Sequence, residues 1–282
     1  MLGNTETCFL TDLRTDGFAG SFCRMNKPTH QQLVDVCIEA ARKAGSYALE
    51  NIHRREEYIE QFEHDIKLVM DRECQTLAEK IILSHFPDHA VLGEEGTIET
   101  THDFEWIIDP IDGTANYTQG LPTWCCSIAV RHNTQILAGC VYVPVLDECY
   151  TATVDGPALL NGELIHVSNV PTLGKATFFG GLTKDIDPRA IALFSELAPQ
   201  VNKIRMIGCA AIDTCHVACG RSDGYYEPGL YIWDIAAAGL IAERAGATIT
   251  EWPRGETHGI RFLCTTPAIH NDLKTIIGKH FA

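Results

Sequence analysis

The chain has 282 residues, of which 45% are hydrophobic and 21% charged, a composition typical of a soluble globular protein. Its 37 acidic and 22 basic residues give a formal net charge of −15. A surface of that sign repels nucleic-acid backbones and anionic lipid, so we expect neither as a partner. An anionic ligand would need a locally positive element, and the sequence contains no cluster of Lys and Arg. A bound divalent cation could supply that charge.

The 12 cysteines form no C-x-x-C pair, and several lie on apolar periodic stretches. This pattern favours reduced core thiols over a disulfide framework. No apolar run approaches the roughly 18 residues that a membrane span needs. The first 24 residues lack the basic and then apolar order of a secretory signal. We therefore expect a cytoplasmic protein with no membrane partner.

Three regions follow from the patterning: a poorly ordered extension at 1–24, an N-terminal α+β half at 25–167 and a C-terminal α/β half at 168–282. In the first half, apolar residues recur every three or four positions over 29–48, which predicts a helix capped by Thr29. A second helix is predicted at 71–86, ended by Pro87.

Short apolar stretches bounded by turn residues predict the strands of the first half, at 90–93, 104–109, 126–131, 136–143 and 148–153. Asn133-Thr134 and Asn161-Gly162 are turn signals, the second a strong hairpin marker. Such a meander predicts a mixed, largely antiparallel sheet rather than a doubly wound parallel one.

The second half alternates between strands and helices. Strands are predicted at 176–180, 203–207, 223–227 and 248–251, and helices at 187–197, 210–220 and 233–245. Pro188 suits the first turn of its helix. No linker separates the halves, so we expect them to share one continuous interface.

Acidic residues gather at strand ends and at a helix start: Glu94-Glu95, Asp109 and Asp112 within 109–114, and Asp234. Each cluster alone could be a turn, a surface loop or a helix cap. Carboxylates held together repel one another unless a cation lies between them, and hard cations bind oxygen ligands. Taken jointly, the clusters predict a metal site.

The stretches that carry these acids resemble the signatures of the inositol monophosphatase family of Mg²⁺-dependent, lithium-sensitive phosphatases. They read Gly93-Glu94-Glu95, Trp106-Ile107-Ile108-Asp109-Pro110-Ile111-Asp112-Gly113-Thr114-Ala115-Asn116 and Trp233-Asp234. The resemblance covers about residues 29–280. It implies a layered αβαβα sandwich and hydrolysis of a phosphate monoester by metal-activated water.

The resemblance also implies roles for individual residues. Two or three Mg²⁺ ions are expected at Glu94, Asp109, the carbonyl of Ile111, Asp112 and Asp234. Thr114, linked to Asp71, and Glu94 are the expected catalytic residues. The expected substrate-binding residues are Asp112, Gly113, Thr114, Cys209, Ala210 and Glu227.

Two departures from the family pattern weigh against a third Mg²⁺ ion and against lithium sensitivity. The stretch from Asp65 to Asp71 lacks the threonine that the family usually has, and Glu60 replaces a frequent lysine. Cys209 stands where the family has serine or threonine, which removes a hydroxyl from the expected rim of the pocket.

The expected substrate is myo-inositol 1-phosphate or a related polyol or sugar phosphate. Histidinol-phosphatase, fructose-1,6-bisphosphatase and 3′-nucleotide bisphosphatase activities are alternatives within the superfamily. A non-catalytic scaffold of the transcription machinery is an alternative of another class. A homodimer is implied as well, and the apolar stretch at 128–143 could supply its interface or belong to the core.

Overall fold

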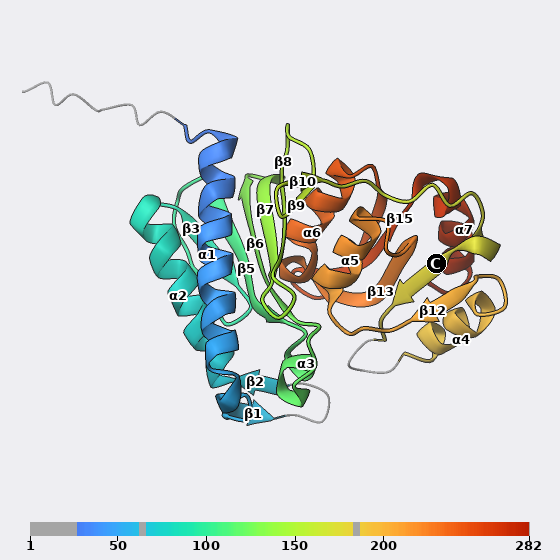
Figure 1. Cartoon of the computed structure of the whole chain (residues 1–282), viewed down its shortest axis with the longest axis horizontal. Helices are drawn as coiled ribbons and strands as arrows, with labels where there is room; N and C mark the ends of the chain where they lie inside the picture. The colour runs from blue at the N-terminus through green and yellow to red at the C-terminus, as the bar shows by residue number, and fades with distance from the viewer. Residues whose placement is uncertain (1–26, 62–65, 183–186, 282) are drawn as a thin grey trace, which may run out of the picture.

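The computed structural model describes residues 27–61, 66–182 and 187–281, so the predicted extension at 1–24 and Asp65 lie outside it. Five layers follow one another in Figure 1. Helices α1 (His30–Glu50) and α2 (Val69–His85) cover a large sheet, and α5 (Ala210–Ala218) and α6 (Ile232–Arg244) separate it from a second sheet. Helices α4 (Pro188–Leu197) and α7 (His270–Phe281) form the last layer. The predicted αβαβα sandwich is confirmed.

Helix α1 begins where its sequence predicts. The Thr29 hydroxyl accepts from the backbone N–H of Gln32 at 3.2 Å, and the Gln32 side chain accepts from the backbone N–H of Thr29 at 2.9 Å. Small buried residues of α1 let α2 approach closely, and the Cys74 thiol donates to the Ala44 carbonyl at 3.5 Å. Helix α2 starts two residues earlier than predicted and ends at His85, before Pro87.

The large sheet has the strand order β10-β9-β8-β7-β6-β5-β3-β4, and within it only β3 and β5 run parallel. The predicted mixed, largely antiparallel sheet is therefore confirmed. Asn133, Asn161 and Gly162 all have positive φ, as the tight turns at these positions require. The strands are β3 (Ala90–Gly93), β4 (Gly96–Ile98), β5 (Phe104–Asp112), β6 (Cys125–His132), β7 (Gln135–Val143), β8 (Glu148–Thr153), β9 (Leu159–Leu160) and β10 (Glu163–Leu164).

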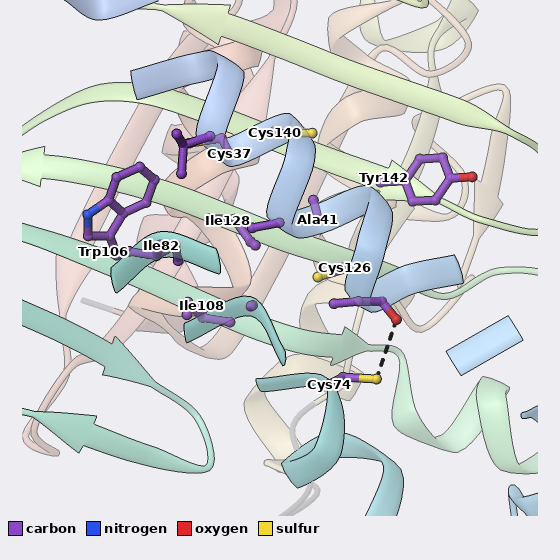
Figure 2. Close-up of a cluster of buried hydrophobic side chains, with 14 of the residues drawn as sticks. Cys37, Ala41, Cys74, Ile82, Trp106, Ile108, Cys126, Ile128, Cys140 and Tyr142 are labelled. Carbon is purple, nitrogen blue, oxygen red and sulfur yellow. Dashed lines mark hydrogen bonds between the residues drawn. The ribbon is translucent and has the colours of Figure 1, made fainter. Parts of the chain in front are cut away.

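Both faces of the large sheet are buried. Trp106 and Ile108 of β5 pack towards α1 and α2, whereas Ile107 belongs to the core around α5 and α6 (Figure 2). The stretch at 128–143 is divided between the same two cores, with Ile128 and Val141 fully buried. Of the two explanations for its apolar character, core burial within one chain accounts for it.

The second sheet has the order β12-β11-β13-β15-β14 and mixes parallel with antiparallel pairs. Strand β15 and helix α7 are additions that the sequence interpretation did not contain. Among the described residues no helix is both long and apolar enough to cross a bilayer. The strands are β11 (Thr177–Gly180), β12 (Lys203–Arg205), β13 (Gly224–Tyr231), β14 (Thr248–Pro253) and β15 (Gly259–Thr265).

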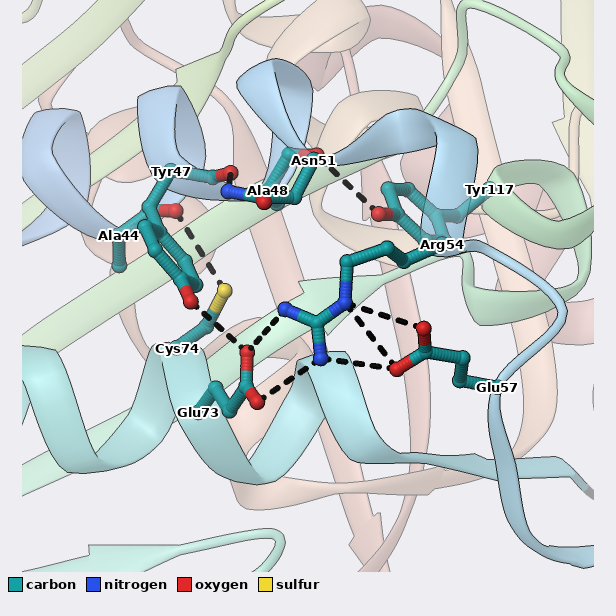
Figure 3. A network of polar contacts seen from close by, with 9 residues as sticks. All are labelled: Ala44, Tyr47, Ala48, Asn51, Arg54, Glu57, Glu73, Cys74 and Tyr117. Carbon is teal, nitrogen blue, oxygen red and sulfur yellow. Dashed lines mark hydrogen bonds and ion pairs between the residues drawn. The ribbon is translucent and has the colours of Figure 1, made fainter.

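A polar network fixes the short helix α3 (Thr114–Gln119) at the end of α1 (Figure 3). The Tyr117 hydroxyl donates to the Ala48 carbonyl at 3.1 Å. Arg54, just after α1, pairs with Glu73 of α2 at 2.9 Å and with Glu57 at 2.8 Å. The ion pairs are partly exposed to solvent, which screens their attraction, so their main effect is to orient these elements. The antiparallel pair of β1 (Tyr58–Gln61) and β2 (Ile66–Leu68) lies beside them.

Candidate active site

A β-bulge brings Asp109 and Asp112 to one face of the large sheet. In the pairing of β5 with β6, Asp109 lies opposite Ser127 and Asp112 opposite Cys125, so three steps on β5 match two on β6. Residues two apart on a regular strand share a face, and directly paired residues share it too. Both aspartates therefore face α5 and α6. Pro110 is tolerated inside the strand because it lies in the bulge.

The first turn of α5 holds Asp112 in place. Its carboxylate accepts the backbone N–H of Ala211 at 2.6 Å and of Ala210 at 3.3 Å, and the Cys209 thiol donates to it at 3.1 Å. The sequence placed Cys209 at the pocket rim, but the structure buries it and directs its thiol to Asp112. Ala210 does line the cavity described below.

Glu94 follows β3, the strand that runs parallel to β5, and its backbone N–H donates to the Ile108 carbonyl at 3.1 Å. This turn places Glu94 next to Asp109. The side chain of Gln75 on α2 fixes the turn by accepting from the backbone N–H of Glu95 at 2.9 Å and donating to the Gly96 carbonyl at 3.0 Å. A Cβ at Gly93 would collide with the end of that side chain, so a larger residue there would displace Gln75 from these contacts.

Asp234 and Asp71 occupy the same position, the third residue of a helix. Asp234 accepts the backbone N–H of Tyr231 at 2.7 Å at the start of α6, and Asp71 accepts that of Leu68 at 3.1 Å at the start of α2. An acid that caps the start of its helix can therefore also serve the expected site. Asp234 lines the cavity, and Asp71 is buried.

The turn between β5 and α3 depends on Gly113, which has φ +86° and whose added Cβ would meet the Thr123 carbonyl oxygen at 3.0 Å. The Thr114 hydroxyl donates to the Ile111 carbonyl at 3.0 Å, and the Ile111 N–H donates to Asp109 at 3.1 Å. A carbonyl oxygen has two lone pairs, so that of Ile111 can still accept a further ligand. The expected link of Thr114 to Asp71 stays a prediction.

The carboxylates of Glu94, Asp109, Asp112 and Asp234 line one cavity of about 1250 Å³, whereas Asp71 is not among its lining residues. Burial raises the pKa of Asp109, and the charges of Glu94, Asp112 and Asp234 raise it further. Burial followed by the charges of Asp112 and Glu94 raises the pKa of Asp234 in the same way. Buried carboxylates that repel one another and offer only oxygen donors fit a hard divalent cation. The predicted acids named here thus converge in space.

Glu227 lies in the same cavity, in the middle of β13 and next to Gly181. The Tyr225 hydroxyl donates to its carboxylate at 2.7 Å, and burial raises the pKa of Glu227 to about 7. Sequence reasoning missed Asp213, buried on α5, whose pKa is raised first by burial and then by the charge of Glu227. An acid on a largely apolar helix was the available signal.

Two further features escaped the sequence interpretation. Asn116, quoted only as part of a signature, donates to the carbonyls of Thr123 at 2.7 Å and Ile207 at 2.8 Å, which joins α3 to the turn before α5. The cavity is also lined by three arginines of the C-terminal half, Arg189, Arg254 and Arg261. Arg189 lies far from Arg254 and Arg261 in the sequence, so no local cluster indicated that the three line one cavity.

Comparison with known proteins identifies the family. Residues 29–278 match the Inositol monophosphatase family. An inositol monophosphatase of Dictyostelium discoideum is 34% identical over 90% of this chain and 97% of its own length, and the Nus factor SuhB of Vibrio cholerae is 35% identical over 79% and 86%. The structure of a Thermotoga maritima IMPase has a TM-score of 0.79 at 30% identity, covering 88% of this chain and 97% of that one. The chain belongs to the inositol monophosphatase family and is a phosphatase of that superfamily.

Proposed function

We propose that this phosphatase hydrolyses the phosphate monoester of a small polyol or sugar, with myo-inositol 1-phosphate as the reference substrate, and that it uses Mg²⁺. The supporting observation is the convergence of Glu94, Asp109, Asp112 and Asp234 on one cavity, where their charges raise the pKa of Asp109. The family is generally metal-dependent. The identity of the ion and a number of two or three per chain belong to the proposal.

The proposed ligands are Glu94, Asp109, the carbonyl of Ile111, Asp112 and Asp234. When bound, Mg²⁺ supplies positive charge that neutralises phosphoryl oxygens and makes a neighbouring water more acidic. Thr114 and Glu94 orient the attacking water. Asp71, at the start of α2, positions Thr114. The backbone N–H groups of Gly113 and Thr114 donate to phosphoryl oxygens, which the missing Cβ of Gly113 allows to approach.

Glu227 supports a polyol or sugar as the leaving group. Its carboxylate lines the cavity together with Asp112 and Gly113, and Tyr225 fixes its orientation. A carboxylate accepts hydrogen bonds from ring hydroxyls, which an aromatic leaving group lacks. We propose that Glu227 binds these hydroxyls and that the backbone of the turn at Cys209 and Ala210 lines the same pocket.

The test is a phosphate-release assay with myo-inositol 1-phosphate, histidinol phosphate, fructose 1,6-bisphosphate and 3′-phosphoadenosine 5′-phosphate, each with Mg²⁺ and with EDTA. Activity that requires Mg²⁺ and is highest with a polyol or sugar phosphate is expected. Asp109→Asn should lower kcat/KM by about 10³-fold, since metal charge stabilisation amounts to several kcal/mol. Asp88→Asn, an exposed acid outside the cavity, is the matched control and should behave as the wild type.

Activity with EDTA equal to that with Mg²⁺ would refute the metal proposal. Preference for the nucleotide or for histidinol phosphate would refute only the substrate. The alternative of a non-catalytic scaffold has some support from the Nus factor SuhB relatives, but all four proposed carboxylate ligands are present here. The implied homodimer and cytoplasmic location are proposals too, and sedimentation velocity tests the first.

A further inference from the structure

Two buried cysteines lie against the carboxylate of Asp112. Cys125 begins β6 and is paired with Asp112 in the register of β5 with β6, and Cys209 is the residue before α5. Their sulfur atoms are 3.6 Å apart, and the Cys209 thiol donates to Asp112 at 3.1 Å. One ligand atom from each of the three side chains lies within 4.8 Å of the other two. We call Asp112, Cys125 and Cys209 the thiol site.

The spacing of these atoms suits a tetrahedral ion with sulfur ligands. Zn²⁺ binds thiolate sulfur at about 2.3 Å and carboxylate oxygen at about 2.1 Å, so at tetrahedral angles two sulfurs lie about 3.8 Å apart and a sulfur and an oxygen about 3.6 Å apart. The observed separations of 3.6 and 3.1 Å are close to these values, so small rotations of the side chains bring the atoms into place. Thiolates select Zn²⁺ over Mg²⁺, which binds oxygen ligands.

The thiol site can be reached from the cavity, because Asp112 and Ala210 line it. The proton that the Cys209 thiol donates to Asp112 lies between sulfur and oxygen, where an ion would replace it. The bonds from the backbone N–H groups of Ala210 and Ala211 to Asp112 can remain. A water molecule from the cavity completes the tetrahedron, as in zinc sites with three protein ligands.

We propose that Asp112, Cys125 and Cys209 bind a thiophilic divalent cation, with Zn²⁺ as the reference ion, and that the bound ion draws Asp112 away from Mg²⁺ and so inhibits the phosphatase. Two Zn–S bonds form, two thiol protons pass to solvent, and no electron is transferred. The inhibition rests on the proposed function, because Asp112 is a proposed ligand of Mg²⁺, whereas binding at the thiol site does not.

Binding is tested with Cd²⁺, whose bonds to thiolates give an ultraviolet charge-transfer absorption. The full chain is titrated without Mg²⁺, and we expect this absorption with the first equivalent of Cd²⁺. Cys125→Ala should lose about half of it or more, because one of the two thiolate ligands is gone. Cys140→Ala is the matched control and should keep it, since the sulfurs of Cys140 and Cys149 are also 3.6 Å apart but neither residue lines the cavity. Loss in Cys140→Ala but not in Cys125→Ala would overturn the inference.

Inhibition is tested by phosphate release at subsaturating Mg²⁺ with increasing Zn²⁺. Cys125→Ala should raise the Ki of Zn²⁺ by about 100-fold or more, because even an outer contact to a metal ligand contributes about 10- to 100-fold. Cys125→Ser, which keeps the size of the side chain, replaces it if the alanine variant fails to fold. An equal Ki in the variant and the wild type would mean that Zn²⁺ acts at the other acids, and would overturn the inference. If no substrate is hydrolysed, the proposed function fails, and the Cd²⁺ titration alone decides whether the thiol site binds an ion.

Discussion

The thiol of Cys209 shows how a single departure from the family pattern is accommodated. It donates to the carboxylate of Asp112 at 3.1 Å and lies 3.6 Å from the sulfur of Cys125. Burial raises the pKa of Cys209 well above its usual value, so the sulfur stays protonated and can act as the donor. A serine hydroxyl at this position could make the same contact.

We therefore predict that Cys209→Ser keeps kcat/KM near the wild-type value, whereas Cys209→Ala lowers it by about tenfold, as loss of an outer contact to a metal ligand does. Steady-state kinetics with saturating Mg²⁺ measures both. Cys264→Ala, at a buried cysteine outside the cavity, controls for the loss of a core sulfur. Equal activity of Cys209→Ala and Cys209→Ser would show that the donor is dispensable.

At the scale of elements, the turn after β3 is held by a side chain from another layer. Gln75 bonds to both Glu95 and Gly96 and is buried. Removing it deprives the half-buried Glu95 N–H and the carbonyl of the exposed Gly96 of their partner, at about 0.5–1.5 kcal/mol for each of the two hydrogen bonds. The neighbouring Glu94 then loses its fixed orientation.

Gln75→Ala is expected to lower the free energy of unfolding by about 1–3 kcal/mol and to weaken Mg²⁺ binding by about 10- to 100-fold. Urea unfolding and the Mg²⁺ dependence of kcat measure the two effects. Gln31→Ala removes an exposed glutamine whose partner is one turn away on α1, and should change neither. Unaltered Mg²⁺ dependence in Gln75→Ala would separate the turn from metal binding.

Features that depend on nearby residues could be predicted from the sequence. The Thr29 cap, the strands at 90–93 and 148–153 and the Asn161-Gly162 turn are confirmed, because capping, alternation and positive φ act over a few residues. The acidic clusters were visible for the same reason.

Features that depend on pairing between distant segments could not be predicted. The bulge that turns Asp109 and Asp112 to one face appears only in the register of β5 against β6. The contact of Gln75 with the turn at Glu95 joins separate elements, and so do the contacts of Arg189 and Arg261 with the Phe281 ring. Strand β15 was missed although it lies between β13 and β14 in the second sheet.

At the scale of the whole molecule, the acidic site lies where three layers meet. The end of β5 comes from the large sheet, the first turns of α5 and α6 come from the middle layer, and Glu227 comes from the second sheet. Apolar cores on both sides of the middle layer supply the stability that buried, mutually repelling carboxylates reduce. The stability of the metal-free protein should therefore depend on pH.

The direction follows from the raised pKa values. Burial raises the pKa of Asp109 and Asp234 above the unfolded value of about 4, and that of Glu227 to about 7. Their contribution to stability is complete below about pH 4 and is lost as the pH rises through the folded-state pKa values. Burial lowers the pKa of His89 and His216 to about 4. The contribution of these histidines to stability therefore increases as the pH rises from about 4 to about 6.5.

The stabilisation by Mg²⁺ distinguishes the contribution of the acids to the pH dependence of stability from that of the histidines. Only the acids repel one another where the ion would bind. We predict that saturating Mg²⁺ raises the Tm more at pH 8 than at pH 6, since protons compete with the ion at the lower pH. At a concentration 100 times Kd the gain is about 2.7 kcal/mol. Thermal unfolding followed by circular dichroism, with EDTA or Mg²⁺ at each pH, measures it.

In Asp109→Asn the metal-free protein should be more stable at pH 8 than the wild type, because one repelling charge is gone, and the Mg²⁺ gain should shrink. An equal Mg²⁺ gain at both pH values would mean that these carboxylates are not the groups that bind the ion.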